Sequence, residues 1–157
     1  MSRLQREVKK KHAFASLEQE AALNLARTND RVAIEFERLF RGYALTPSQY
    51  NILRILRGEG KPMPILAIAE RTVTVVPGIT GLIDRLERAE FVARRRCTED
   101  RRVIFVEITS KGRAVLSQLD QPVLDLHEKL MGHLSERELR GLIGLLEKVR
   151  VAIVADT

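Results

Sequence analysis

The sequence predicts a mainly α-helical fold with one small β-hairpin. Two observations lead to this prediction. Apolar residues recur at three-, four- and seven-residue steps near both ends of the 157-residue chain, whereas the period changes after residue 90, where Ile104, Val106 and Ile108 fall on one face of an expected strand. We therefore expect long helices over residues 16–42 and 110–157, a compact centre over residues 43–109, and a basic N-terminal extension over residues 1–15.

Capping signals predict where several helices begin. Three capping boxes are present: Ser16 with Gln19, Thr46 with Gln49, and Ser135 with Glu138. The first two helices should end at Gly42 and near residues 58–60, and a short third helix should cover residues 65–71. A long helix should start near Ser110 after the cap Thr109. Pro122 should kink or interrupt it, because proline lacks the amide donor.

The fourth expected helix, residues 76–90, has two contrasting faces. Its inner face carries large apolar residues: Ile79, Leu82, Ile83 and Leu86. Its outer face is small and uncharged at the start and becomes basic further along: Pro77, Gly78, Thr80, Gly81, Asp84, Arg85 and Arg88. Each helical glycine costs on the order of 1 kcal/mol relative to alanine. Either this weakness is tolerated, or the missing side chains let the helix approach another surface closely.

Positive charge is concentrated in two short segments. Residues 1–12 hold five cations against one acid, for a charge of +4, and residues 94–102 hold five arginines against two acids, for +3. The net charge is +6, so the rest of the chain sums to −1. Such focusing suits a polyanionic partner. For residues 1–12, a simple solubility tail is an equal alternative.

Composition and motifs exclude several classes of protein. Hydrophobic residues make up 45% of the chain, which excludes a wholly disordered protein, and no apolar run reaches the roughly 18–20 residues of a membrane span. No apolar run follows the first charges, so no secretory signal is expected. Cys97 is the only cysteine and cannot form an internal disulfide, which favours the reducing cytoplasm and an inert thiol.

No catalytic or metal-binding pattern is present either. The chain has no phosphate-binding glycine loop and no Gly-x-Ser-x-Gly motif. We therefore expect that the protein is not an enzyme and that it binds no cofactor. The three histidines lack the spacing of metal ligands, and no metal site is expected: His12, His127 and His133.

The order of the central elements predicts a winged helix-turn-helix lobe. Three short helices are followed by a basic hairpin with strands near 91–96 and 103–108. In such lobes a helix enters the roughly 12 Å wide major groove, and a basic hairpin can reach the minor groove. We therefore expect double-stranded DNA as the partner. An architectural or RNA-binding protein is the alternative, although only 4% aromatic residues disfavours stacking on RNA bases.

Three segments together resemble the MarR family of bacterial transcription regulators: Leu45-Thr46-Pro47-Ser48-Gln49-Tyr50, Gly81-Leu82-Ile83-Asp84-Arg85-Leu86-Glu87, and Asp100-Arg101-Arg102 followed by Ile108-Thr109-Ser110-Lys111-Gly112. The resemblance covers roughly residues 14–154. It implies a homodimer with interlocking N- and C-terminal helices, a pseudo-palindromic operator, and often release by a small ligand such as an aromatic or phenolic acid. Repression is the family's commoner mode of action.

The expected DNA contacts lie on the fourth helix and on the hairpin, here called the wing: Thr74, Val76, Pro77, Gly78, Thr80, Gly81, Arg85, Arg94, Arg96, Asp100, Arg101 and Arg102. The resemblance assigns Arg102 to the minor groove, with Asp100 holding its guanidinium by a bidentate hydrogen bond. Arg94, Arg96 and Arg101 are expected to contact phosphates. Because Val75 and Val76 stand where the family often has serine or threonine, the helix cap comes from Thr74 or is absent.

Two further groups of residues are candidates for an effector pocket and for a dimer interface. Four aromatic residues are candidates for the effector pocket, and are equally consistent with a core: Phe36, Phe40, Tyr43 and Tyr50. Apolar stripes on the terminal helices are too long to be covered by the central lobe, so they are candidates for the dimer interface: Leu17, Ala21, Leu25, Leu139, Leu142, Leu146, Val149 and Ile153.

Overall fold

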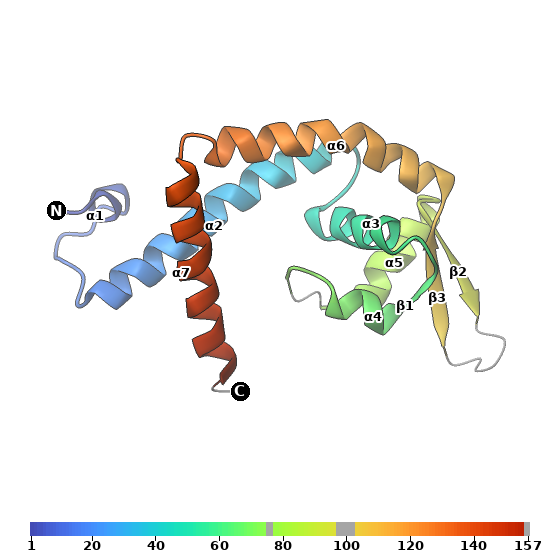
Figure 1. Ribbon diagram of the computed structural model, residues 1–157, viewed down its shortest axis with the longest axis horizontal. Coiled ribbons are helices and arrows are strands. Elements are labelled where there is room, and N and C mark those ends of the chain that lie inside the picture. The colour runs from blue at the N-terminus through green and yellow to red at the C-terminus, as the bar shows by residue number, and fades with distance from the viewer. Residues whose placement is uncertain (75–76, 97–102, 156–157) are drawn as a thin grey trace. The chain divides into compact units, whose positions relative to one another are not determined.

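The computed structural model describes residues 1–74, 77–96 and 103–155, and confirms a mainly helical fold with a small β-sheet (Figure 1). The chain divides into two compact units, Met1–Leu116 and Ser117–Thr157. The described elements follow one another as α1 (Arg3–Glu7), α2 (Leu17–Arg41), α3 (Pro47–Glu59), β1 (Met63–Pro64), α4 (Ile65–Glu70), α5 (Ile79–Arg88), β2 (Val92–Arg96), β3 (Ile104–Ile108), α6 (Ser110–Met131) and α7 (Glu136–Ala155).

The capping boxes begin their helices as expected. At α3 the Thr46 side chain accepts a hydrogen bond from the Gln49 amide at 3.2 Å, and the Gln49 side chain accepts one from the Thr46 amide at 2.9 Å. Gly60 then ends α3 in the left-handed conformation, with φ of 74°. At α2 the Ser16 hydroxyl accepts the Gln19 amide at 3.2 Å, but the Gln19 side chain accepts the amide of Ala15 instead of that of Ser16. At α7 Ser135 and Glu138 bond each other's backbone amides, as in a complete capping box. Local hydrogen bonding therefore sets these boundaries.

The sheet has three strands, not the two of a simple hairpin. β1 pairs antiparallel with β3, which also pairs with β2, so the strand order is β1-β3-β2. Met63 lies opposite Val106, and both side chains are buried. The prediction missed β1 because two residues ending in proline are too short to show an alternating pattern.

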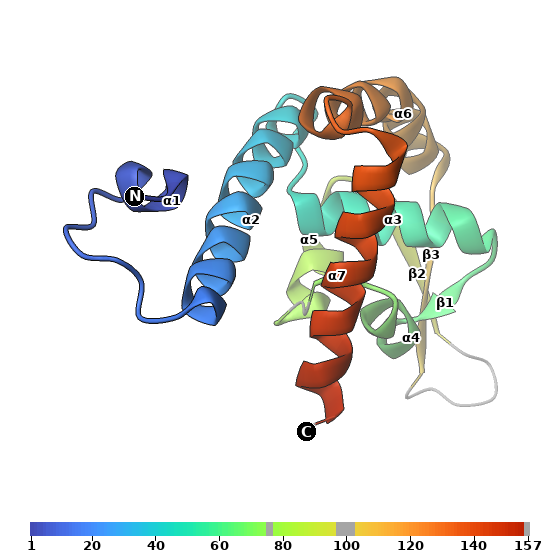
Figure 2. The same cartoon turned by 60° about the vertical axis from the view of Figure 1, so that its left-hand side comes forward.

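The core of the winged lobe lies where α3, α4 and α5 meet the sheet (Figures 1 and 2). Its fully buried side chains come from all four parts: Ile52, Leu53, Leu56, Ile68, Ile83, Leu86 and Val106. On β3, Ile104 remains 36% exposed while Val106 and Ile108 are buried. Ile104 lies opposite Arg96, at the end of the hairpin nearest residues 97–102.

Two predicted helix features need correction. The fourth helix begins at Ile79, not Val76, because Gly78 adopts a left-handed conformation with φ of 69° and stands as the N-cap residue. Pro77 therefore lies before the helix. Pro122 does not interrupt α6, which continues from Ser110 to Met131, and the alternative of a kink stays a prediction. Proline inside a helix costs about 3 kcal/mol, but Leu119, Val123 and Leu126 around it are buried and offset this cost.

The N-terminal extension also folds. Residues 3–7 form α1, capped by the Ser2 hydroxyl, and Leu4 is only 3% exposed. Nothing in the charge pattern of residues 1–12 announced this short helix. Within the part of the chain that the structure describes, no helix is long and apolar enough to cross a membrane.

Candidate nucleic-acid interface

The start of α5 presents backbone instead of side chains. Gly78 is exposed, and no side chain caps the helix, so of the two cap alternatives the absent one is correct. The first amides of an α-helix have no partner inside the helix and carry partial positive charge. An uncapped, exposed helix start is therefore suited to an anionic oxygen such as a DNA phosphate.

The outer face of α5 is open while its inner face is buried. The described residues expected to contact DNA here are all exposed: Thr74, Pro77, Gly78, Thr80, Gly81 and Arg85. Ile83 and Leu86 on the inner face are fully buried. A Cβ atom added at Gly81 would meet nothing within 4 Å, so packing does not require glycine there. The two exposed glycines, Gly78 and Gly81, leave room for another surface to approach the helix backbone.

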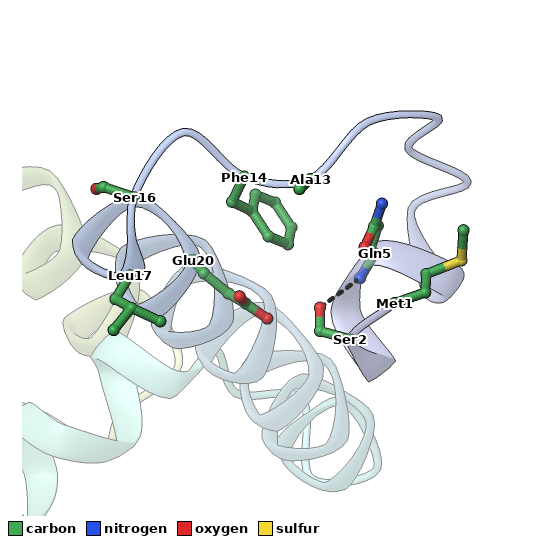
Figure 3. A pocket seen from close by; sticks show the side chains of 8 residues that line it. All are labelled: Met1, Ser2, Gln5, Ala13, Phe14, Ser16, Leu17 and Glu20. Atoms are coloured by element: carbon green, nitrogen blue, oxygen red, sulfur yellow. Dashed lines mark hydrogen bonds between the residues drawn. The ribbon is translucent and has the colours of Figure 1, made fainter.

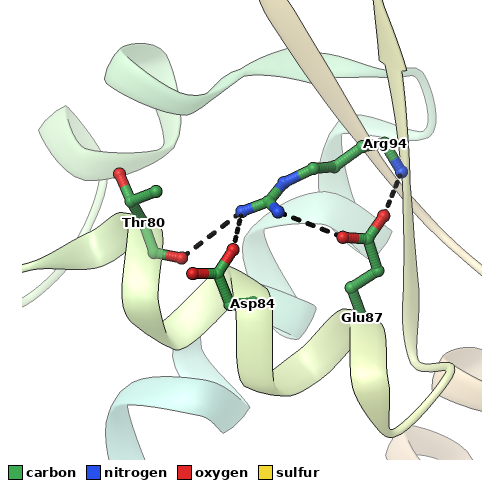
Figure 4. Close-up of polar contacts among 4 residues, drawn as sticks. All are labelled: Thr80, Asp84, Glu87 and Arg94. Carbon is green, nitrogen blue, oxygen red and sulfur yellow. Dashed lines mark hydrogen bonds and ion pairs between the residues drawn. The ribbon is translucent and has the colours of Figure 1, made fainter.

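Arg94 joins the wing to α5 (Figure 4). One guanidinium nitrogen lies 2.5 Å from the Asp84 carboxylate and 3.4 Å from the Thr80 carbonyl oxygen, and the other lies 3.1 Å from Glu87. The Glu87 carboxylate also accepts the Arg94 backbone amide at 3.2 Å. The Arg94 side chain is only 22% exposed. It is therefore engaged inside the lobe by two carboxylates of α5.

Asp84 and Glu87 are the residues that sequence reasoning did not pair with Arg94. They stand three residues apart on α5, so their side chains lie on neighbouring positions of one helix face. That spacing was visible in the sequence. The strand residue that meets them depends on how the sheet lies against the helix, which was not visible.

Besides Arg94, the described part of the wing holds two arginines, Arg95 and Arg96, which differ in their surroundings. Arg95 forms a 2.8 Å ion pair with Glu107 of the neighbouring strand. Arg96 is exposed, and no salt bridge is recorded for it within the residues described. The expected tip residues Asp100, Arg101 and Arg102 lie outside the described residues, as do Cys97 and Val76.

The junction between the lobe and α6 is tightly built. The Thr109 hydroxyl donates to the Glu90 carbonyl oxygen at 2.7 Å and accepts the Gly112 amide at 3.1 Å, which confirms Thr109 as a cap. A Cβ atom at Gly112 would overlap the Phe91 carbonyl oxygen, so this position needs glycine. Lys111 donates a hydrogen bond to Glu90 and lowers the pKa of that carboxyl group.

Three of the four candidate effector-binding residues form one aromatic stack. The ring centroids of Phe36 and Phe40 are 5.9 Å apart, and those of Phe40 and Tyr50 are 4.3 Å apart. Phe40 is 2% exposed and is a core residue. Tyr43 is half-buried beyond the end of α2. The stack therefore joins α2 to α3, at the base of the winged lobe.

The expected dimer residues leave apolar surface uncovered in the single chain. Leu17 is 82% exposed, and Ala21 and Leu25 on the same helix are also exposed. On α7, Leu142, Val149 and Ile153 are exposed, whereas Leu139 and Leu146 are half-buried. Among the residues described, no group of three His, Cys, Asp or Glu side chains could hold a metal ion.

The lobe is that of a winged helix-turn-helix DNA-binding protein, and comparison with known proteins agrees. The family model described as MarR family matches residues 45–104. A MarR transcription factor from Planctomyces limnophilus is 44% identical, with a TM-score of 0.68 over 86% of this chain and 98% of that structure. The chain belongs to the MarR family of transcription regulators.

Two other relatives extend this comparison. The homoprotocatechuate degradative operon repressor of Escherichia coli is 26% identical over 113 residues, covering 72% of this chain and 76% of the repressor. The fold also matches that of a mutant MarR from Escherichia coli complexed with operator DNA, with a TM-score of 0.75 at 24% identity over 86% of this chain and 99% of that one. These names describe regulators, in line with the expectation that the chain is not an enzyme.

Proposed function

We propose that the protein is a homodimeric repressor that binds a pseudo-palindromic DNA operator and is released by a small ligand. The exposed, uncapped start of α5 carries the DNA-binding part of this proposal. With its inner face buried and only glycine at positions 78 and 81 of its outer face, the start of α5 suits the major groove. Thr80 and Arg85 are exposed, and they are the polar side chains proposed to contact DNA there.

The wing supplies the second set of proposed contacts. Arg102 would enter the minor groove, held by Asp100, as the family resemblance implies. Arg96 and Arg101 would contact phosphates, which set the register of the protein on DNA. We remove Arg94 from this set, because its guanidinium already binds Asp84 and Glu87. Its proposed role is to hold the wing at a fixed angle to α5.

The dimer part of the proposal rests on uncovered apolar surface. On α2 and α7 the exposed apolar side chains are grouped in stripes, whereas single exposed apolar residues are common on any protein surface. A second copy of the chain could bury these stripes. Two lobes held at a fixed spacing then match two half-sites about one helical turn apart. A DNA-binding role also agrees with the cytoplasmic location that the sequence favours.

The effector part of the proposal concerns the aromatic residues. Phe36 and Tyr50 flank the buried Phe40 where α2 meets α3, so a flat aromatic ligand there would bias the position of the lobe. The name of the Escherichia coli relative ties that repressor to the degradation of an aromatic acid. Phenolic acids are therefore the first ligands to test.

A gel-shift titration tests the proposal directly. The probe is the DNA upstream of the protein's own gene, with and without excess random competitor DNA. A sharp complex that resists the competitor and dissociates with a phenolic acid supports the regulator. Weak binding that grows with DNA length and ignores every ligand supports the architectural alternative instead.

A further inference from the structure

The N-terminal segment, residues 1–16, is a folded structure that presents three consecutive lysines. Ser2 caps α1, Leu4 and Gln5 are buried, and the Lys10 amide donates to the Gln5 carbonyl oxygen at 3.0 Å. The Lys10 ammonium also lies over the Phe14 ring, 5.7 Å from its centre. Phe14 and Gln5 face one another across a groove of ≈ 430 Å³ (Figure 3). The lysines are therefore carried on a structured turn, unlike those of a free tail.

The charge of this turn is not neutralised within the chain. Glu7 is the only acid among the first twelve residues, and it pairs with Arg3 at 3.0 Å. Within the described residues, no carboxylate forms a salt bridge with Lys9, Lys10 or Lys11. Lys9 and Lys11 are exposed. The ammonium groups of Lys9 and Lys11 are thus available to an anion, and half-buried Lys10 adds its charge from beside Phe14.

We propose that the lysine turn, Lys9–Lys11, binds backbone phosphates of duplex DNA, in addition to the contacts made by the winged lobe. The proposal rests on the DNA-binding function proposed above. Away from this segment and the wing, the chain sums to −1, so the turn lies in one of two positive segments of a chain whose remainder is almost neutral. Ammonium groups contact phosphates without reading bases, so the turn would add affinity and not sequence preference.

The length of α2 separates these contacts from those of the lobe. The 25 residues of α2 span about 37 Å at 1.5 Å per residue, and one turn of duplex DNA is about 34 Å long. The lysine turn and the lobe of one chain therefore lie far enough apart along α2 to contact different stretches of DNA. Their contributions to affinity should be independent and should add.

The test compares two variants that lose the same charge. Lys9→Gln/Lys10→Gln/Lys11→Gln removes the lysine turn, and Lys129→Gln/Arg137→Gln/Lys148→Gln removes three exposed cations of α6 and α7. Affinity for a duplex of about 40 base pairs, roughly four helical turns, is measured by fluorescence anisotropy over a series of salt concentrations. Thermal unfolding followed by circular dichroism checks that both variants remain folded.

We expect the lysine-turn variant to show a shallower slope of log K against log salt than the control. One to three lost phosphate contacts per chain make two to six per dimer. The slope, which is negative, should therefore become less steep by about 2 to 5. The change should be equal on operator and random DNA. Equal slopes for the two variants would overturn the inference, as would a loss of binding to anionic lipid vesicles with no change on DNA.

The outcome is separable from the proposed function. If the unmodified protein does not prefer its operator over random DNA, the proposed regulator fails. If it prefers the operator and the lysine-turn variant behaves as the control does, only the present inference fails.

Discussion

Asp84 and Arg94 form a 2.5 Å ion pair that joins α5 to the first strand of the wing (Figure 4). The two elements that carry the expected DNA contacts are thereby connected by side chains as well as by the turn between them. Glu87 strengthens the connection because it binds both the side chain and the backbone amide of Arg94. A bidentate or multiply bonded arginine has a defined geometry that a lysine cannot reproduce.

Asp84→Asn should weaken operator binding if this connection positions the wing. The expected loss is about 1 kcal/mol, a roughly fivefold rise in Kd. Removing a negative charge near DNA by itself predicts tighter binding, so the two explanations differ in sign. Glu107→Gln is the matched control, because it removes one carboxylate from the Arg95 pair on the same hairpin without touching α5. Tighter binding by Asp84→Asn would contradict a positioning role.

Arg102→Ala should weaken operator binding more than alanine at Arg96 or Arg101. An arginine in the narrow minor groove gains from concentrated negative potential, whereas a phosphate contact does not. Asp100→Ala should mimic part of this loss, because it frees the Arg102 side chain. Anisotropy titrations on operator and random duplexes provide the measurement. Equal tightening on both DNAs after Asp100→Ala would mean that Asp100 acts only as a charge.

Gly81→Ala should separate stability from DNA binding. A methyl group at this position meets no atom within 4 Å in the free protein, and alanine favours helix by up to about 1 kcal/mol. The melting temperature should therefore rise or stay constant. Operator affinity should fall, because the new methyl group stands on the face proposed to approach DNA. Unchanged affinity in the stabilised variant would show that close approach at Gly81 is not required.

Gly112→Ala should destabilise the junction between the wing and α6. The added methyl group would overlap the Phe91 carbonyl oxygen, which is backbone and cannot rotate away. We expect a loss of about 1 to 3 kcal/mol in the free energy of unfolding. Urea denaturation measures it. Gly141→Ala is the control, because the structure leaves open space at that helical position.

Val149→Glu should convert the proposed dimer into a monomer, because a charge on the apolar stripe of α7 would be buried at the interface. Val151→Glu is a matched control. It introduces the same charge on an exposed valine, about 200° around the helix from Val149. Light scattering at micromolar concentration distinguishes the two states. A dimer that survives Val149→Glu, or a monomeric unmodified protein, would contradict the proposed interface.

The sequence by itself determined the order of the helices α2 to α7 and most of their ends. Thr46, Gln49 and Gly60 act through hydrogen bonds and backbone preferences within a few residues, so their effect could be predicted without knowing the fold. The buried face of α5 followed equally from its periodic apolar residues. The outer face, and with it most of the candidate DNA-binding surface, could therefore be predicted as well.

Only the tertiary structure decided which distant residues meet. The pairing of Met63 with Val106 and the engagement of Arg94 by Asp84 and Glu87 join residues whose partners are not set by local spacing. The continuity of α6 through Pro122 has the same origin, because buried side chains on either side offset a local preference for breaking the helix. Local chemistry sets the ends of helices, whereas packing decides which charges remain free to bind DNA.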